Sequence, residues 1–210
     1  MPRVSEELTN VRKGEILDAF EKLYQTKSVR NISMREIGEK TSLTRSSIYN
    51  YFQTKEEIQL GLTIREFTLW KDELRKISLY SKMNVEEFAK AIADSLSERK
   101  QFIKLISWNH CEIEENSRLE NLAEIQKITY DAMQLLLSCL DKTFSNMNKD
   151  KKQGFMIDFF TYIYGIDCFI QVSQKQQESL KLANIPYHPL TIYDAVYGFI
   201  LRYFGQEDKK

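Results

Sequence analysis

Three helix-start signals follow one another in one short stretch of the sequence, and they restrict it to short helices joined by tight turns. Ser33 and Glu36 have the spacing of a capping box, in which each side chain accepts a hydrogen bond from the other residue's backbone N–H. Thr44 can cap a second helix, since its side-chain oxygen can accept from a free N–H of the first turn. Thr54 with Glu57 repeats the box and opens a much longer helix.

The first two helices are separated only by residues 40–43, a connection of the length found in a helix-turn-helix. In the second helix Ile48 and Phe52 lie four residues apart, so they share one face and should be buried. The other side chains combine donors for phosphate oxygens with an arginine and an asparagine that can pair with base edges. We predict that this helix reads DNA; an ordinary capped hairpin with a hydrated face is the alternative. The predicted outward side chains are Arg45, Ser46, Ser47, Tyr49, Asn50 and Tyr51.

Residues 43–55 resemble the recognition-helix signature of the TetR/AcrR transcriptional regulators, in which an aromatic, a polar residue, Tyr-Phe and then Lys recur in this order. The resemblance extends back to a helix whose apolar residues recur at i, i+3, i+4, i+7 and i+8 and would pack on the helix-turn-helix. Those residues are Ile16, Ala19, Phe20, Leu23 and Tyr24. The rest of the chain resembles the family only in length and helical character.

The resemblance implies that Arg45 and Asn50 approach bases, while serine, tyrosine and lysine side chains hold phosphates. Lys55 also suits an anion on local grounds, because it takes the first position of the helix capped by Thr54, at the positive end of the helix dipole. The full predicted DNA-binding set is Ser33, Arg35, Arg45, Ser46, Ser47, Tyr49, Asn50, Tyr51 and Lys55.

Serine stands at three positions where many relatives have glycine: Ser28, Ser42 and Ser46. On the predicted reading face, Ser46 could add a hydroxyl contact or hinder the approach of the backbone. Ser42 should require a less strained turn than glycine permits. We therefore expect individual contacts, but not the fold, to differ from those of relatives.

Charge is unevenly distributed along a chain that is neutral overall. Residues 1–55 carry ten Lys and Arg against seven Asp and Glu, a net charge of +3, which leaves −3 on the remainder. A positive excess at one end suits a DNA-binding head joined to a body that does not bind nucleic acid.

With 210 residues, of which 42% are hydrophobic, the chain can bury a substantial core. Its three prolines are Pro2, Pro186 and Pro189, so proline excludes helix nowhere between residues 3 and 185. An apolar run of about eighteen residues is lacking, the amino terminus is too polar for a signal peptide, and three cysteines without metal-type spacing suit a reducing compartment. We predict a cytoplasmic all-α protein with no membrane partner, divided into a three-helix head (1–55) and a larger helical ligand-binding and dimerisation body (56–210).

Further capping signals, Asn84 with Glu87 and Ser117 with Glu120, divide the body. The sequence predicts helices near residues 54–78, 84–97, 99–109, 118–145, 151–176 and 189–205, with loops at 146–150 and 183–189. The second loop follows from its two prolines.

The last two predicted helices carry apolar and tyrosine-rich surfaces wider than one narrow stripe, so we expect them to form a subunit interface. Two helices from each chain would make a four-helix bundle; packing within one chain is the alternative. A dimer also suits DNA recognition, since it reads two half-sites about 34 Å apart. The predicted interface residues are Phe155, Phe159, Ile163, Tyr193, Val196, Tyr197 and Ile200.

The middle of the chain combines aromatic side chains with a few polar groups, a mixture typical of a mostly apolar ligand pocket and equally of ordinary core. His110 and Glu114 lie one helical turn apart, but a metal site needs three or four converging ligands and the chain has two histidines, so we predict no metal and no cofactor. The predicted pocket residues are Trp70, Phe102, Trp108, His110, Cys111, Tyr130, Tyr162 and Asp167.

Together these features predict a ligand-responsive DNA-binding transcriptional regulator, which by the family's usual output is a dimeric repressor released from double-stranded operator DNA by a small molecule. The helix beginning at Thr54 would transmit the signal. A helical small-molecule carrier or enzyme, or a dimeric protein-interaction module, is the alternative. The sequence lacks G-x-x-x-x-G-K, H-E-x-x-H and G-x-S-x-G motifs, so we predict no enzymatic activity.

Overall fold

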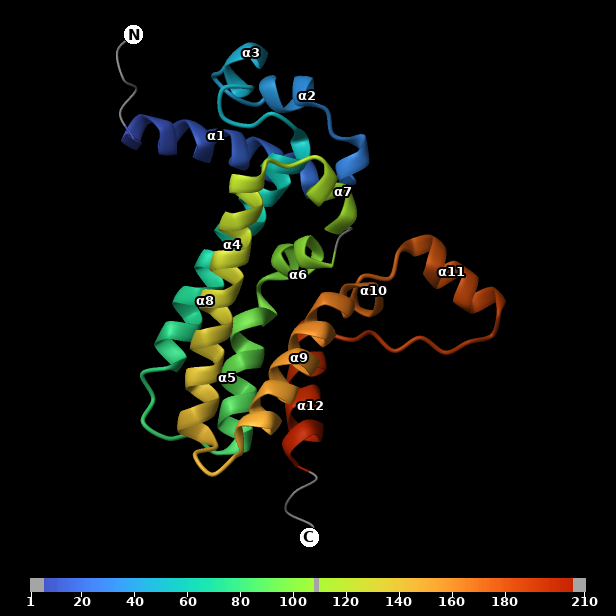
Figure 1. Cartoon of the computed structure of the whole chain (residues 1–210). Coiled ribbons are helices and arrows are strands. Elements are labelled where there is room, and N and C mark those ends of the chain that lie inside the picture. Colours follow the sequence, from blue (N-terminus) through green and yellow to red (C-terminus); the bar gives the residue numbers. More distant parts are fainter. Residues whose placement is uncertain (1–5, 108–109, 206–210) are drawn as a thin grey trace. The chain divides into compact units, whose positions relative to one another are not determined.

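The computed structural model describes residues 6–107 and 110–205, apart from the side chains of His110 and Cys111. The described residues form helices joined by turns and loops, with no strand among them, which confirms the predicted all-α fold (Figure 1). No described helix is both long and apolar enough to cross a membrane. In chain order the elements are α1 (Glu6–Tyr24), η1 (Val29–Asn31, a 3-10 helix), α2 (Met34–Gly38), α3 (Arg45–Ile48), α4 (Lys55–Ile77), α5 (Val85–Ser97), α6 (Lys100–Ile106), α7 (His110–Glu115), α8 (Leu119–Thr143), α9 (Lys149–Gly165), α10 (Asp167–Ile170), α11 (Gln174–Leu182) and α12 (Ile192–Phe204).

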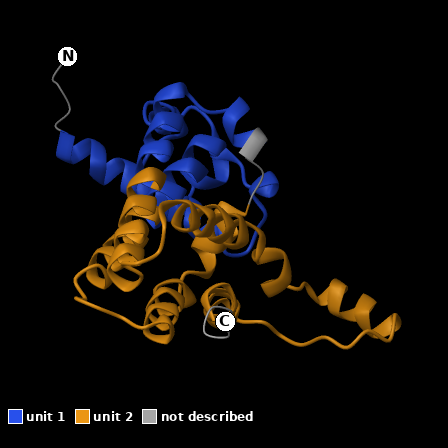
Figure 2. Ribbon diagram, turned by 60° about the horizontal axis from the view of Figure 1, so that its bottom comes forward, with its two compact units in different colours: residues 1–66, 109–128 blue, residues 67–108, 129–210 orange. Residues whose placement is uncertain are grey.

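The chain divides into two compact units, which Figure 2 shows in different colours. Unit 1 comprises residues 1–66 and 109–128, and unit 2 comprises residues 67–108 and 129–210. The long helices α4 and α8 each begin in unit 1 and continue into unit 2. Unit 1 therefore contains the predicted head and adds the first part of α4, α7 and the first part of α8.

The core of unit 1 is built on the apolar side of α1. Ile16 and Phe20 have no exposed surface, and the Phe20 and Tyr24 rings stack with their centroids 5.9 Å apart. Ile37 from α2 and Ile48 from α3 are also fully buried. Because each helix is short, burial of these few large side chains, rather than helix propensity, stabilises it.

Two of the three predicted helix starts of the head form as expected. The Ser33 hydroxyl accepts from the Glu36 N–H at 3.3 Å, and the Glu36 carboxylate accepts from the Ser33 N–H at 3.0 Å. The Thr44 hydroxyl accepts from the Ser47 N–H at 3.2 Å. These bonds satisfy backbone donors that a helix end leaves without intrahelical partners, which explains why α2 and α3 can form despite their length.

The third start, at Thr54, also forms, but the Glu57 carboxylate binds groups other than the one that a capping box predicts. The Thr54 hydroxyl accepts from the Glu57 N–H at 3.0 Å, as predicted. The Glu57 carboxylate accepts from the N–H of Gln53 at 2.8 Å and also binds the Arg118 side chain, a contact that the capping motif does not predict.

Aromatic side chains from several helices meet in the core of unit 2. Phe88 from α5 packs against Phe155 from α9 and Phe204 from α12, with ring centroids 6.4 and 6.5 Å away. In α4, Trp70 packs on Phe102 of α6 at 5.6 Å and donates its indole N–H to Ser95 at 3.1 Å. This is the core that orders the second halves of α4 and α8.

Most predicted body helices agree closely with the structure, but two predictions are wrong. The predicted helix 151–176 ends at Gly165, and α10 and α11 follow as separate helices. The separate start of α11 follows from a capping box that sequence analysis missed: Ser173 has extended backbone and accepts from the Gln176 N–H at 3.2 Å. The predicted helix 99–109 ends at Ile106, and residues 108 and 109 lie outside the described residues.

The predicted capping box of Ser117 and Glu120 is also wrong. The buried Ser117 hydroxyl has no hydrogen-bond partner among the described residues, and α8 begins at Leu119, where the N–H groups of Asn121 and Leu122 bond to the Arg118 carbonyl. Arg118 is bound to Glu57 through both backbone and side chain, and this contact places the helix start one residue later.

Candidate DNA-binding site

The candidate site centres on α3 and the turn that follows it. Ile48 and Phe52 point into unit 1, where they are 0% and 6% exposed, as the sequence predicted. The other side chains of this segment keep solvent access. We call this group the reading surface; it comprises the exposed Arg45, Ser46, Tyr49 and Asn50 and the half-exposed Ser47 and Tyr51.

Within the reading surface, Arg45 lies beside Tyr49. The guanidinium carbon is 5.9 Å from the centre of the Tyr49 ring, and a terminal N–H donates to the Tyr49 hydroxyl at 3.4 Å. Stacking on an aromatic ring restricts the arginine while leaving most of its five N–H donors available. This arrangement suits bidentate pairing with a guanine edge or a phosphate.

Three hydroxyls cluster at the start of α3. The Thr44 oxygen lies 3.0 Å from that of Ser46 and 2.8 Å from that of Ser47. All three are at the helix end where backbone N–H groups and the positive end of the dipole favour an anion. Ser46, which replaces the glycine of many relatives, thus adds a hydroxyl to this end of the helix.

The turn between α2 and α3 is fastened to α1. Arg12 donates to the Ser42 hydroxyl at 2.8 Å and pairs with Glu15 at 3.1 Å, while the Glu15 carboxylate accepts from the Ser42 N–H. That backbone hydrogen bond is the main reason why the pKa of Glu15 lies below its ordinary value. Among the described residues only Asn184 has positive φ outside glycine, so Ser42 fits its turn without strain.

Three predicted DNA-binding residues are already engaged within the protein. The Ser33 hydroxyl donates to Glu36 at 2.8 Å as part of the α2 cap. Lys55 donates to the carbonyls of Val29 and Arg30 at 3.1 and 3.4 Å. Arg35 pairs with Glu39, the residue that ends α2, at 3.0 Å, and its side chain is 79% exposed.

Sequence analysis did not predict how the carboxylate of Glu57, at the start of α4, is bound by Arg118. Glu57 is 1% exposed, and Arg118 donates to it from Nε at 2.7 Å, from Nη2 at 2.9 Å and from its backbone N–H at 3.1 Å. Burial alone would raise the pKa of Glu57, but the hydrogen bonds from Arg118 and Gln53 and the arginine charge lower it overall. The capping motif was the only signal for Glu57, and no local pattern marks Arg118.

Two sequence profiles match this chain. The one described as bacterial regulatory proteins, tetR family, matches residues 16–60, and the one described as tetracyclin repressor-like, C-terminal domain, matches residues 64–200. The chain belongs to the TetR family. It is therefore a DNA-binding transcriptional regulator, and the resemblance seen in the sequence is confirmed.

Solved structures of TetR-family proteins resemble the chain over nearly its whole length. A TetR-family transcriptional regulator from Mesorhizobium loti has a TM-score of 0.58 at 14% identity, covering 92% of this chain and 96% of that one. The TetR-family repressor AlkX from Dietzia sp., implicated in biodegradation of n-alkanes, has a TM-score of 0.47 at 12% identity, covering 96% and 98%. At 14% identity the likeness to the Mesorhizobium loti protein concerns the fold alone. No curated protein matches the sequence at a significant level.

The described residues among those predicted to line an effector pocket lie in different surroundings. Trp70 and Phe102 contact each other, but both are fully buried in the core of unit 2. Tyr130 is 61% exposed, and Tyr162 donates to the Ala195 carbonyl at 3.1 Å. Asp167 is half-buried, and burial raises its pKa. Trp108 and the side chains of His110 and Cys111 lie outside the described part of the chain.

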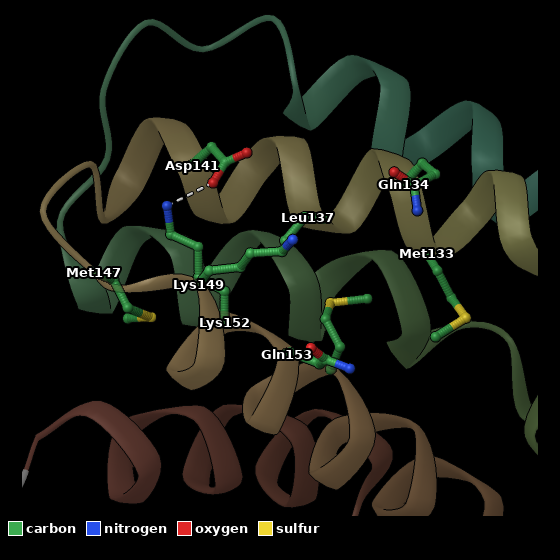
Figure 3. Close-up of a pocket in the computed structure, with 9 residues that line it drawn as sticks. Met133, Gln134, Leu137, Asp141, Met147, Lys149, Lys152 and Gln153 are labelled. Carbon is green, nitrogen blue, oxygen red and sulfur yellow. Dashed lines mark hydrogen bonds and ion pairs between the residues drawn. The ribbon is translucent and has the colours of Figure 1, made fainter.

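A cavity of about 590 Å³ lies instead between the second half of α8 and the start of α9 (Figure 3). Its size falls within the usual range of small-molecule sites. Lys152 and Asp141 form an ion pair of 2.6 Å beside it. The lining residues are Met133, Gln134, Leu137, Asp141, Met147, Lys149, Lys152, Gln153 and Met156. Three flexible methionines give this wall the ability to adapt to apolar ligands of different shape.

Most of the residues predicted for a dimer interface serve the core of unit 2. Side chains with no exposed surface cannot contact a second chain, so this assignment needs correction for five of the seven residues. They are Phe155, Phe159, Ile163, Val196 and Ile200, each 0% exposed. Tyr193 and Tyr197, whose rings stack at 5.5 Å, are half-exposed.

A different set of side chains on α9 and α12 reaches the surface. Phe199 stacks on Tyr162 at 4.5 Å and contacts Tyr203 at 6.0 Å, and all three are half-exposed. Burial raises the pKa of both Tyr162 and Tyr203; the charge of Arg202 opposes this rise at Tyr162, and the charge of Asp158 adds to it at Tyr203. Arg202 and Asp158 are both exposed. We call these five residues the α9–α12 seam.

Proposed function

We propose that this TetR-family regulator is a dimeric repressor that reads a two-fold operator through the reading surface and leaves it when a small molecule binds unit 2. The observation that carries the proposal is the division of α3 into a buried apolar side and an exposed side of donors. An ordinary surface helix would gain more from Glu and Lys pairs than from this combination of arginine, asparagine, tyrosine and serine.

In the proposed complex Arg45 and Asn50 pair with base edges, and Ser46, Ser47, Tyr49 and Tyr51 bind phosphates. Ser33 and Lys55, which are bonded within the protein, are proposed to shape the head, and Lys55 also adds positive charge near the phosphates. The exposed side chain of Arg35, in the preceding helix α2, is proposed to add a phosphate contact.

The dimer is proposed to form through the α9–α12 seam. In a two-fold interface the same surface of both copies is in contact. The aromatic side chains of one seam could then pack on those of the other, and its two opposite charges could pair across the axis. A dimer would present two reading surfaces to half-sites about 34 Å apart, which one short helix cannot cover.

The α8–α9 cavity supports the proposal of an effector. Its methionine and leucine wall with a lysine and carboxylate rim suits an apolar molecule that carries one or two polar groups. An effector that binds better to a conformation with misplaced reading surfaces would lower operator affinity by the ratio of its own affinities for the two conformations.

The test begins with selection of bound duplexes from a random-sequence library, followed by fluorescence anisotropy titrations at two salt concentrations. We expect the protein to enrich a two-fold sequence and to bind it far more tightly than random duplex, with affinity falling as salt rises. Arg45→Ala should weaken operator binding by about tenfold or more, the usual cost of losing a bidentate base contact. Arg75→Ala, which removes an exposed arginine of α4 paired with Asp72, is the matched control and should bind normally.

Equal, weak binding to every duplex would reject the proposed function in favour of a carrier or a protein-interaction module. If the operator is enriched but Arg45→Ala binds it as the unaltered protein does, the reading surface has been misassigned.

A further inference from the structure

Glu57 and Arg118 connect parts of unit 1 that are far apart in sequence. Glu57 lies in the first turn of α4, and Arg118 is the residue immediately before α8. The guanidinium binds both carboxylate oxygens, Nε to Oε1 and Nη2 to Oε2, the two-bond geometry that orients an arginine most strictly. We call this pair the Glu57–Arg118 clamp.

The clamp reaches the reading surface through the backbone. The same Nη2 group of Arg118 donates to the carbonyl of Tyr51 at 3.3 Å, and the carboxylate of Glu57 accepts from the N–H of Gln53 at 2.8 Å. Tyr51 and Gln53 stand at the end of the segment that carries Arg45 and Asn50. Both members of the clamp therefore bind the backbone on which the reading surface is mounted.

A second bond strengthens the same connection. The Thr54 hydroxyl donates to the Asn116 carbonyl at 2.8 Å, and the Asn116 side chain donates to the Glu112 carbonyl of α7 at 2.8 Å. The turn between α7 and α8 is thus tied to residues on both sides of the start of α4. If the clamp served only to neutralise the buried Glu57 carboxylate, its bonds to the backbone of Tyr51 and Gln53 would not be needed.

We propose that Arg118 is a positioning residue for DNA recognition: by holding the Tyr51 carbonyl and the Glu57 carboxylate together, it sets the orientation of the reading surface. The inference rests on the proposed function. In this inference both α4 and α8 control the orientation of the reading surface. Arg118 immediately precedes α8, so a movement of α8 would move Arg118. The other half of α8 lines the α8–α9 cavity, so an effector that shifts α8 would act on the clamp.

The experiment compares Arg118→Lys with Arg65→Lys on the selected operator and on random duplex. Lysine keeps the charge and one bond to Glu57 but lacks the planar fork that binds Glu57 and Tyr51 at once. Arg65 is a matched control in the same unit: it pairs with Asp18 and Glu21 at 2.5 Å each and joins α4 to α1 without a bond to residues 44–53. Circular dichroism melting of each protein establishes a temperature at which all are folded.

At that temperature we expect Arg118→Lys to bind the operator about tenfold more weakly, a clear change in Kd, while its weak binding to random duplex stays the same. Arg65→Lys should bind both duplexes as the unaltered protein does, even if it melts at a lower temperature. Glu57→Gln retains the shape and an acceptor but loses the charge, so its operator affinity should lie between those of Arg118→Lys and Arg65→Lys. If Arg118→Lys does not fold, Glu57→Gln takes its place in the test.

Two results would overturn the inference: operator affinity unchanged in the folded clamp variant, or an equal loss in Arg118→Lys and Arg65→Lys, which would make Arg118 a stabilising residue only. A protein that selects no sequence before any substitution would reject the proposed function, and the clamp's role in recognition with it. That result is distinct from sequence-specific binding that the clamp variants leave intact.

Discussion

Glu36 is a single side chain that both caps the start of α2 and pairs with Lys27, in the segment that follows α1. It accepts from the Ser33 N–H and hydroxyl and from Lys27, whose ammonium lies 2.5 Å away. The Lys27 hydrogen bond, followed by those from Ser33, lowers the pKa of Glu36 to about 2. Because the folded-state pKa is lower than the ordinary 4.5, the charged carboxylate stabilises the fold above pH 4.5, and this stabilisation is lost as the pH falls towards 2.

We therefore expect Glu36→Gln to lower the melting temperature at neutral pH, with a difference from the unaltered protein that shrinks as the pH falls from about 4.5 to about 2. Thermal melts followed by circular dichroism across this range measure the difference. Lys27→Met should reproduce part of the effect, since it removes the largest contribution. A difference that is the same at pH 3 and at pH 7 would exclude the lowered pKa as its cause.

Residues of the reading surface could be predicted because their contacts are local. Thr44 bonds to Ser46 and Ser47, and Arg45 lies over Tyr49, all within one helical turn. Arg118 could not be predicted, because its partners Glu57 and Tyr51 are more than sixty residues away in the sequence. No periodicity or capping motif records a contact of that kind.

At the scale of helices, the same capping pattern succeeded at Asn84 and failed at Ser117. Asn84 accepts from the Glu87 N–H at 2.8 Å, and the motif there has no competitor. Next to Ser117, the contacts of Arg118 with Glu57 determine where the helix starts instead. Helix ends are predictable where local bonds dominate, and tertiary contacts override them elsewhere.

The end of α11 shows a local device that the sequence analysis left out. Asn184 has φ of 55°, and the N–H groups of Asn184 and Ile185 bond back to the carbonyls of Lys181 and Leu180 at 3.1 and 2.9 Å. These are the two bonds of a Schellman motif, in which the left-handed residue is usually glycine or asparagine.

We expect Asn184→Ala to destabilise the end of α11 by about 1 kcal/mol, because alanine is disfavoured in the left-handed region, whereas Asn184→Gly should leave it intact. Hydrogen–deuterium exchange at the Ile185 amide reports on this end directly and should become faster in the alanine variant only. Equal exchange rates in both variants would mean that another contact fixes the turn.

For the whole molecule, the sequence predicted the helical class and the DNA-binding head more directly than the pocket and the interface of the body. Trp70, Phe102, Phe155 and Phe159 have the composition of a pocket or an interface, yet they are buried in the core of unit 2. Core, pocket and interface use the same apolar residue types, and only the packing of several helices decides which residue does which. In the head, the outward residues are polar and the buried ones apolar, so the sequence distinguishes the two sets.

The α9–α12 seam leads to the prediction made at this scale. Asp158 and Arg202 are exposed on the two helices of the seam, and we predict that Asp158 of one copy faces Arg202 of the other across the two-fold axis of the proposed dimer. Asp158→Arg and Arg202→Asp should each weaken the proposed dimer, because like charges would then face each other. The double variant should restore it, because the charges are exchanged and opposite again.

Sedimentation equilibrium of the four proteins measures the dimerisation constant. The Arg75→Ala protein should sediment as the unaltered one does, since its substitution lies outside the seam. Dimers of equal strength in all four proteins would place the interface elsewhere, and failure of the double variant to recover would show that the two side chains do not face each other across the axis.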